Sequence, residues 1–190
     1  MYDGLWSRTR INVISKSSKR FIIIIGGRGS GKSVGAADIC LVDALDNGVK
    51  TYCLREYQSS IKNSVHSLLK EEIKRLELEG FTPQQNSIQL DNEDSFQFAG
   101  LARNVDSIKS AHGFKRYWIE ESQFISDESL TTLTPTARKK PKKGMPTELE
   151  EIIEDDNVSM LFIANPASSA DAFSQRFINP FIAEVERNGY

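Results

Sequence analysis

Apolar positions follow two different periods along this chain. Residues 21–25 form an unbroken apolar run rich in β-branched residues, a pattern typical of a strand buried on both faces in a parallel sheet. After residue 33 the apolar positions recur every three or four residues, which predicts a helix that ends at Asn47 and Gly48. The apolar face of this helix consists of Val34, Ala37, Leu41, Ala44 and Leu45.

The same two periods alternate over the rest of the chain. Residues 49–54 predict a second strand, and alternating residues on both sides of the acidic turn at 91–94 predict a β-hairpin. Apolar runs that end near residues 119 and 164 predict two further strands. Between the second strand and the hairpin we expect a long helix that Gly80 ends, with an apolar stripe of Ile61, Val65, Leu68, Leu69, Ile73 and Leu76. The alternation predicts a three-layer α/β sandwich with a mainly parallel sheet.

The turn between the first strand and the first helix carries the most specific motif. Gly26, Gly31, Lys32 and Ser33 match the phosphate-loop pattern G-x-x-x-x-G-K-[ST]. Glycines let the backbone curl so that its N–H groups point at phosphate oxygens, and the helix that follows adds its N-terminal dipole. The sequence therefore predicts a nucleoside triphosphate site, whose binding residues are Gly26, Gly27, Arg28, Gly29, Ser30, Gly31, Lys32, Ser33 and Val34.

Three side chains of this loop have expected chemical roles. Lys32 can reach the β- and γ-phosphates, and Ser33 can ligate Mg²⁺ through its hydroxyl. Arg28 lies between two glycines, and we expect its guanidinium to stabilise charge on the γ-phosphate in the transition state, as an arginine finger supplied in cis. The alternative is that Arg28 points outward and pairs with a nearby carboxylate.

A second chemical centre follows the apolar run at residues 117–119. We expect Glu120 to help hold Mg²⁺, directly or through water, and Glu121 to orient and polarise the attacking water. Two acids after a strand are commonly just a strand meeting solvent, so this assignment depends on the phosphate loop. The acid pair and the lack of an Asn-Lys-x-Asp motif argue against a GTPase.

Two other strand ends supply candidates for the same site, because parallel strands bring their carboxyl ends to one edge of a sheet. Asn165 can hydrogen-bond the γ-phosphate or the water, or it belongs to an ordinary Asn-Pro turn. Arg55 and Gln58 can touch the nucleotide or a second substrate, or they cap the following helix and face solvent.

Composition limits the class of protein without identifying it. The hydrophobic content of 39% suits a soluble globular chain, and the longest aliphatic run, residues 22–25, is far too short to span a bilayer. The first twenty residues lack the apolar segment of a signal peptide. Cys40 and Cys53 have no metal-binding spacing, so we expect reduced core residues of an intracellular protein. The net charge of −2 does not support a strongly basic nucleic-acid binder, although it leaves room for a local basic patch.

Together these motifs resemble the ATPase domain of the large terminase subunit, the DNA-packaging motor of tailed phages. The resemblance covers about residues 20–180, and Arg28 inside the phosphate loop is its most specific feature. It implies a RecA-like P-loop NTPase fold of the additional-strand, catalytic-glutamate (ASCE) division. The segments that carry it are residues 26–33, 55–65, 108–113, 118–121, 162–166 and 175–177.

The resemblance also implies a function and partners. We expect Mg²⁺-dependent ATP hydrolysis that moves double-stranded viral DNA into a procapsid, in the cytoplasm of the infected bacterial host. The implied partners are the DNA, a small terminase subunit and the portal protein of the procapsid, with a homo-oligomeric ring only on the portal and no membrane. Two alternatives stay open: another ASCE DNA motor, such as a helicase-like or DNA-repair ATPase, and a nucleotide-gated binding module that hydrolyses too slowly to do work.

Two departures from the family pattern bear on these expectations. Glu120 stands where the family commonly has Asp, so we expect a slightly different metal geometry. The family's chains continue into a nuclease domain and nothing here follows Tyr190, so DNA cleavage is not expected from these residues. We expect one ATPase domain over residues 1–190 that lacks its final strand and lid, with an N-terminal arm at 1–19 and a flexible charged loop at about 138–157.

Two segments outside the motifs have open interpretations. Trp6 or Arg8 can contact adenine, or the N-terminal arm is simply solvated. Residues 138–143 hold five positive charges in six positions, and residues 148–156 hold six acids in nine. Such a stretch is a mobile solvated loop, or its basic half touches DNA phosphates while its acidic half competes with them.

Overall fold

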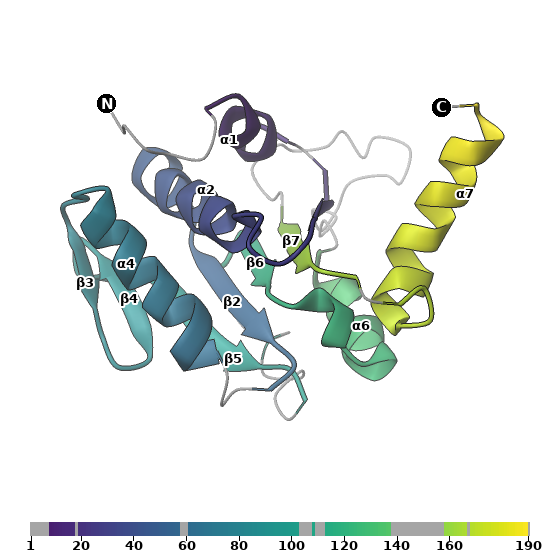
Figure 1. Ribbon diagram of the computed structural model, residues 1–190. Helices are drawn as coiled ribbons and strands as arrows, with labels where there is room; N and C mark the ends of the chain where they lie inside the picture. Colours follow the sequence, from purple (N-terminus) through teal and green to yellow (C-terminus); the bar gives the residue numbers. More distant parts are fainter. Residues whose placement is uncertain are drawn as a thin grey trace, which may run out of the picture.

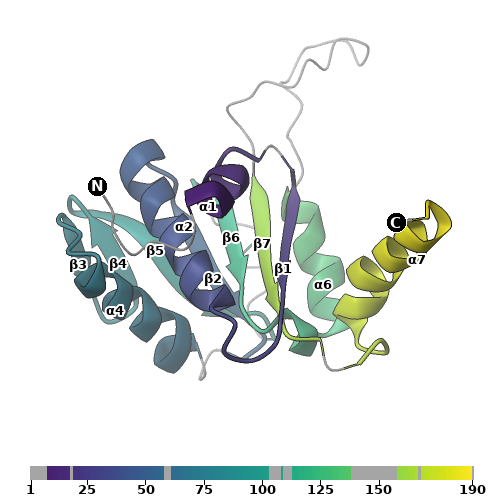
Figure 2. The ribbon, with the colours of Figure 1, turned by 45° about the horizontal axis from the view of Figure 1, so that its top comes forward.

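The protein is organised around one mixed sheet. The computed structural model describes residues 8–17, 19–57, 61–102, 108, 113–137, 158–166 and 168–189. Seven strands follow the order β1-β7-β6-β2-β5-β4-β3, with helices on both faces (Figures 1 and 2). The pairings β1–β7, β7–β6, β6–β2 and β2–β5 are parallel. The pairings β5–β4 and β4–β3 are antiparallel. The expected three-layer sandwich with an added hairpin is confirmed. The strands are β1 (Phe21–Ile25), β2 (Thr51–Arg55), β3 (Phe81–Pro83), β4 (Ser87–Leu90), β5 (Glu93–Gly100), β6 (Arg116–Ile119) and β7 (Ser159–Ala164).

Helices form the two outer layers. One face of the sheet is covered by α2 and α4, with α1 beside α2, and the other by α6, while α7 lies at the β1 side of the molecule (Figures 1 and 2). Short turns precede or follow several of these helices. Two of the described turns have π-helical geometry and two have 3₁₀ geometry. The α-helices are α1 (Arg8–Ser15), α2 (Lys32–Asn47), α4 (Ser67–Arg75), α6 (Asp127–Leu133) and α7 (Asn179–Arg187); the π turns are η1 (Lys62–His66) and η6 (Ser174–Ile178), and the 3₁₀ turns are η2 (Ser122–Phe124) and η3 (Thr134–Ala137).

The central strands are buried on both faces and therefore divide the core in two. In β6, Trp118 packs into the core under α2 and α4, whereas Tyr117 and Ile119 pack into the core on the α6 side. Strand β7 alternates in the same way, with Leu161 on the first side and Phe162 on the second. This two-sided burial is the reason that these strands are continuous apolar runs.

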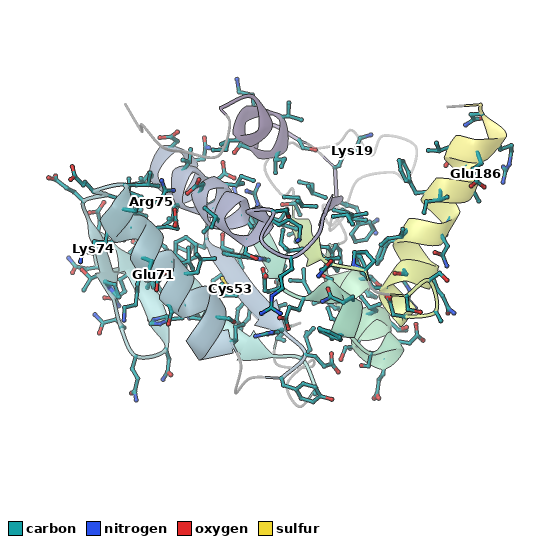
Figure 3. All side chains as sticks on the ribbon, viewed as in Figure 1. Lys19, Cys53, Glu71, Lys74, Arg75 and Glu186 are labelled. Atoms are coloured by element: carbon teal, nitrogen blue, oxygen red, sulfur yellow. The ribbon has the colours of Figure 1, made fainter. Side chains whose placement is uncertain are left out.

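Both cysteines are free thiols in the core between α2 and the sheet, Cys40 on α2 and Cys53 on β2. Cys53 is on β2 in the interior of the molecule, whereas Glu71 and Lys74 lie on the outer face of α4 (Figure 3). Burial raises the pKa of Cys40 to about 11 and the pKa of the Cys53 thiol well above its ordinary value. Protonated, enclosed thiols are inert, which agrees with the structural role expected for them.

A buried ion pair fixes α2 at the amino end of the parallel strands. Arg116, the first residue of β6, pairs with Asp43 in the last part of α2, and its Nε donates to Ser159 Oγ of β7 at 3.4 Å. Removing one partner of such a pair costs about 3–5 kcal/mol, because the other charge stays buried. With its C-terminal half anchored there, α2 directs its N-terminus at the opposite, carboxyl edge of the sheet.

The long helix predicted between β2 and the hairpin is shorter than expected, and Gly80 does not end it. Its described part includes η1, and α4 stops at Arg75, after which the backbone turns back at Glu77 with a left-handed φ of 51°. Leu78 then contributes to the core in the place expected for Leu76. Gly80 instead leads into β3, a strand that the sequence pattern did not predict.

Two further features differ from the sequence expectation. Among the described strands, β1 pairs only with β7 and lies at the sheet edge, so its first four side chains are half-buried and Ile25 is exposed, instead of all being buried on both faces. Residues 8–15, expected in an N-terminal arm, form α1, whose Ile11 is buried. None of the helices in the described part of the chain is both long and apolar enough to cross a membrane.

Candidate active site

The phosphate-loop motif forms the connection from β1 to α2. Gly29 and Gly31 have φ values of 77° and 76°, which side chains with a Cβ adopt only with strain. Gly31 is the N-cap of α2, and no described side chain accepts a hydrogen bond from the first amides of that helix. The start of α2 therefore presents backbone N–H groups and a positive dipole end, which suits a phosphate. Val34, also predicted to bind nucleotide, lies half-buried in the first turn of α2.

Lys32 bends back over the loop in this structure. Its Nζ donates to Gly26 O at 2.6 Å, to Gly27 O at 2.8 Å and to Ser30 Oγ at 3.2 Å. These acceptors are neutral, whereas an anionic phosphate oxygen would add a direct Coulomb attraction to the ammonium. A triphosphate in the loop would thus compete well for Lys32.

The loop and the end of β6 are joined by one hydrogen bond. Ser33 Oγ donates to Glu120 Oε1 at 2.6 Å, across 87 residues of sequence. The other oxygen, Glu120 Oε2, accepts from Trp118 Nε1 at 2.9 Å. Two residues predicted from separate motifs are therefore in direct contact.

The carboxyl of Glu120 lies in surroundings that disfavour its charged form. Burial raises the pKa of its carboxyl above the ordinary value, and the hydrogen bonds from Ser33 and Trp118, together with the charges of Arg55 and Lys32, offset part of that rise. A carboxylate that is buried beside a hydroxyl and only partly compensated attracts a cation.

This donor set fits Mg²⁺. The ion prefers oxygen ligands and is commonly held by one or two carboxylates plus substrate phosphates, with water in the remaining positions. The described residues contain no cluster of three or more His, Cys, Asp or Glu, and a site completed by phosphate oxygens needs none. Ser33 and Glu120 would be the protein ligands.

Glu121 lies beside the same edge but points to a different partner. Its side chain forms an ion pair with Arg55, the last residue of β2. Arg55, for which the sequence left two interpretations open, thus lies next to the glutamate proposed to position the attacking water. Partial burial lowers the pKa of Arg55, and the charge of Glu120 opposes that change. A cavity of about 430 Å³ opens here, lined by Arg55, Glu56, Tyr57, Glu121 and Phe124.

Glu56 is a buried carboxylate that the sequence did not single out. Its Oε2 accepts from the backbone N–H of Ser126, the N-cap residue of α6, and its Oε1 accepts from Ser129 Oγ, both at 3.4 Å. A negative charge at a helix N-terminus is favourable, so Glu56 fixes α6 to the end of β2. The one sequence signal for this role is that Glu56, like Arg55, lies at the carboxyl end of a predicted strand.

The remaining candidates are at the same edge. Arg28 is exposed and forms no ion pair with the described residues, so the carboxylate partner considered as an alternative is not found among them. Asn165 follows β7 and is exposed, and its backbone N–H donates to Gln123 Oε1 at 3.0 Å. Gln123 was not predicted as a site residue, because nothing in its local sequence distinguishes it.

Several sequence expectations lie outside the described residues. These are the contacts of Trp6, the role of Gln58 and the charged loop at 138–157. The backbone of Arg8 is described as part of α1, but its side chain, expected as a possible adenine contact, is not.

A phosphate loop between a parallel strand and a helix, with paired acids after a neighbouring strand, defines a P-loop NTPase of the α/β class. The sequence profile of the phage terminase large subunit family matches residues 18–189, and the chain belongs to that family. No curated protein sequence matches the chain at a significant level.

Solved structures share the fold at low identity. The N-terminal domain of the DNA packaging ATPase from bacteriophage phi29 has a TM-score of 0.65 and 14% identity, covering 91% of this chain and 85% of its own. The phi29 viral genome packaging motor assembly gives 0.64 and 13%, with 91% and 50% covered. The large terminase of a thermophilic bacteriophage in complex with ADP gives 0.62 and 12%, with 92% and 42% covered. The chain thus spans half or less of these longer relatives, and at such identities the likeness shows the fold alone.

The raised pKa of Glu120 predicts a pH-dependent stability difference. The folded protein holds a proton on this carboxyl to higher pH than the unfolded chain does, so its contribution to the free energy of unfolding falls as pH rises through the folded pKa. Glutamine cannot ionise, and its amide can still accept from Trp118 and donate to Ser33. We expect nucleotide-free Glu120→Gln to unfold at a higher temperature than the wild type at neutral pH, with the difference shrinking as the pH falls to about 4.

Thermal unfolding at a series of pH values measures this difference. Glu71→Gln, on the outer face of α4, is the matched control and should show no such trend. A Glu120→Gln protein that is less stable at neutral pH, or a difference that does not change with pH, would contradict the burial argument.

Proposed function

We propose that this chain binds Mg·ATP at the β1–α2 loop and hydrolyses it, as the motor part of a machine that moves double-stranded DNA into a procapsid. The observation that carries the proposal is the 2.6 Å hydrogen bond between Ser33 Oγ and Glu120 Oε1. It joins a phosphate-binding loop to an acidic strand end, and phosphoryl transfer needs both at one place.

The chain's own residues divide the work of the reaction. The amides of the loop and Lys32 hold the phosphates, and Lys32 exchanges its bonds to Gly26 O and Gly27 O for bonds to phosphate oxygens. When bound, Mg²⁺ neutralises charge on the β- and γ-phosphates. Ser33 and Glu120 are the residues that would hold it.

Glu121 is the residue assigned to the attacking water. Its ion pair with Arg55 holds the carboxylate in a fixed direction, and it directly follows Glu120, which supports the assignment of Glu121 to the γ-phosphate end of the site. Asn165, at the end of β7, is assigned to the γ-phosphate or the water. Positioning and charge neutralisation account for most of the catalysis in such reactions, so no covalent intermediate is required.

Family membership supports the larger assignment. The relatives with the same fold include a chain named as part of a viral genome packaging motor assembly and a large terminase in complex with ADP. We propose double-stranded DNA, a small terminase subunit and the portal of a procapsid as partners, with a ring of copies formed on the portal. DNA-stimulated turnover distinguishes this motor from a nucleotide-gated module that hydrolyses too slowly to do work.

The central test of the reaction is the Glu121→Gln variant. It should bind Mg·ATP within a few-fold of the wild type but lose hydrolysis by about 10²–10⁴-fold, because an amide cannot act as a carboxylate base. Calorimetry with ATP and a phosphate-release assay measure the two quantities. Lys32→Ala is the matched contrast, since it should lose tight binding first; near-normal turnover by Glu121→Gln would remove this glutamate from the mechanism.

Arg28 generates a second prediction. The side chain is exposed on the phosphate loop, which supports a role as a finger supplied from within the same chain. Arginine fingers are worth about 10³–10⁵ in rate, and Arg28→Ala should therefore lower kcat far more than ATP affinity. Lys19→Ala, a change of exposed charge before β1, serves as the control.

Concentration dependence separates the two origins of a finger. If Arg28 acts in cis, wild-type specific activity stays constant as the protein concentration rises. A steep rise on self-association would indicate a finger from a neighbouring copy, and loss of affinity without loss of kcat would make Arg28 a phosphate anchor.

A further inference from the structure

One peptide group connects the phosphate loop to the turn that carries Glu121. The carbonyl oxygen of Ala164, the last residue of β7, accepts from the backbone N–H of Gly26 at 3.3 Å. The N–H of the same peptide group, which belongs to Asn165, donates to Gln123 Oε1 at 3.0 Å. The Ala164–Asn165 peptide is thus bonded on one side to the loop and on the other to η2.

The two ends of this connection are the parts of the site that must be aligned. On the loop side, Gly26 O accepts from Lys32 Nζ at 2.6 Å, so the phosphate-binding lysine and Ala164 contact the same residue. On the other side, Gln123 lies two residues after Glu121, and the turn is closed by a hydrogen bond from Phe124 N to Glu121 O at 2.9 Å.

The backbone at Glu121 needs outside support. Its φ and ψ of 51° and 48° are left-handed, a conformation that residues with a Cβ adopt rarely and at a cost. Such a residue keeps its conformation only where its surroundings fix it. Three contacts support it: Ser122 Oγ donates to Ile119 O at 2.9 Å within the turn, Glu121 pairs with Arg55, and Gln123 joins η2 to β7.

We propose that Gln123 is a positioning residue, which sets the place of Glu121 relative to the phosphate loop through the Ala164–Asn165 peptide. Gln123 does not touch the reacting atoms. Its amide oxygen fixes η2 to the end of β7, and β7 in turn carries Gly26 by a main-chain hydrogen bond. Because a displacement of about 1 Å in a catalytic group can lower a rate by about 10²-fold, this single contact is enough to matter.

The inference rests on the proposed ATP hydrolysis, but its first test does not need nucleotide. Gln123→Met keeps the length of the side chain and removes the strong acceptor, whereas Gln123→Glu keeps an acceptor oxygen at the same distance along the chain. In the nucleotide-free protein, the amide proton of Asn165 should exchange with solvent faster in Gln123→Met and close to the wild-type rate in Gln123→Glu. Unchanged exchange in Gln123→Met would overturn the contact itself.

The second test measures the consequence for catalysis. With Mg·ATP, Gln123→Met should lower kcat by about 10–100-fold with ATP affinity within about twofold of the wild type, and Gln123→Glu should recover most of kcat. Gln97→Ala on β5, which also removes one side-chain amide bond, is the matched control for stability and should leave kcat unchanged.

Each outcome decides the matter. A kcat of Gln123→Met within twofold of the wild type, or a loss that Gln123→Glu shares and that follows the unfolding temperature, would make Gln123 a merely structural residue. If the wild type itself does not hydrolyse ATP, the proposed function fails, and the exchange of the Asn165 amide still shows whether Gln123 holds the turn.

Discussion

The hydrogen bond from Ser33 to Glu120 is the contact on which the rest of the site depends. It forms because β1 and β6 are both parallel neighbours of β7, so their carboxyl ends meet at one edge of the sheet. The buried pair of Arg116 and Asp43 holds the other edge, which directs the N-terminus of α2 at Glu120. The fold thereby delivers a hydroxyl and a carboxylate to the same place from distant parts of the sequence.

At this edge of the sheet, contacts within the protein hold the charged side chains of the site. The pKa of Glu120 is raised by its surroundings, Lys32 donates to backbone carbonyls, and Glu121 is held by Arg55 in a left-handed turn. An anionic phosphate would offer Lys32 a Coulomb attraction that neutral carbonyls lack, and a cation would compensate the buried Glu120. Strain and incomplete charge compensation at one edge of an otherwise well-packed sheet are typical of a functional site, which supports the proposed binding of Mg·ATP.

The sequence predicts most of the elements and the phosphate-loop motif of this protein because both are local. Continuous apolar strands, the helix after the loop and the hairpin each follow from a period of a few residues, and the phosphate loop is a single segment. The three-residue strand β3 and the turn at Glu77 have no such signal. Glu56 and Gln123 were missed for a related reason: their partners lie 70 and 42 residues away, and only the folded chain shows that these polar side chains meet backbone groups.

The most direct test of this account is the metal preference of a Ser33→Cys variant. A sulfur ligand binds the hard Mg²⁺ ion poorly and accepts Mn²⁺ better, so the ratio of Mn²⁺-supported to Mg²⁺-supported ATP hydrolysis should rise by about tenfold or more over the wild-type ratio. Ser30→Cys, a serine of the same loop that contacts Lys32 instead of Glu120, should keep the wild-type ratio. A Ser33→Cys protein with the wild-type ratio, or with wild-type activity in Mg²⁺, would contradict the claim that Ser33 and Glu120 mark the metal site.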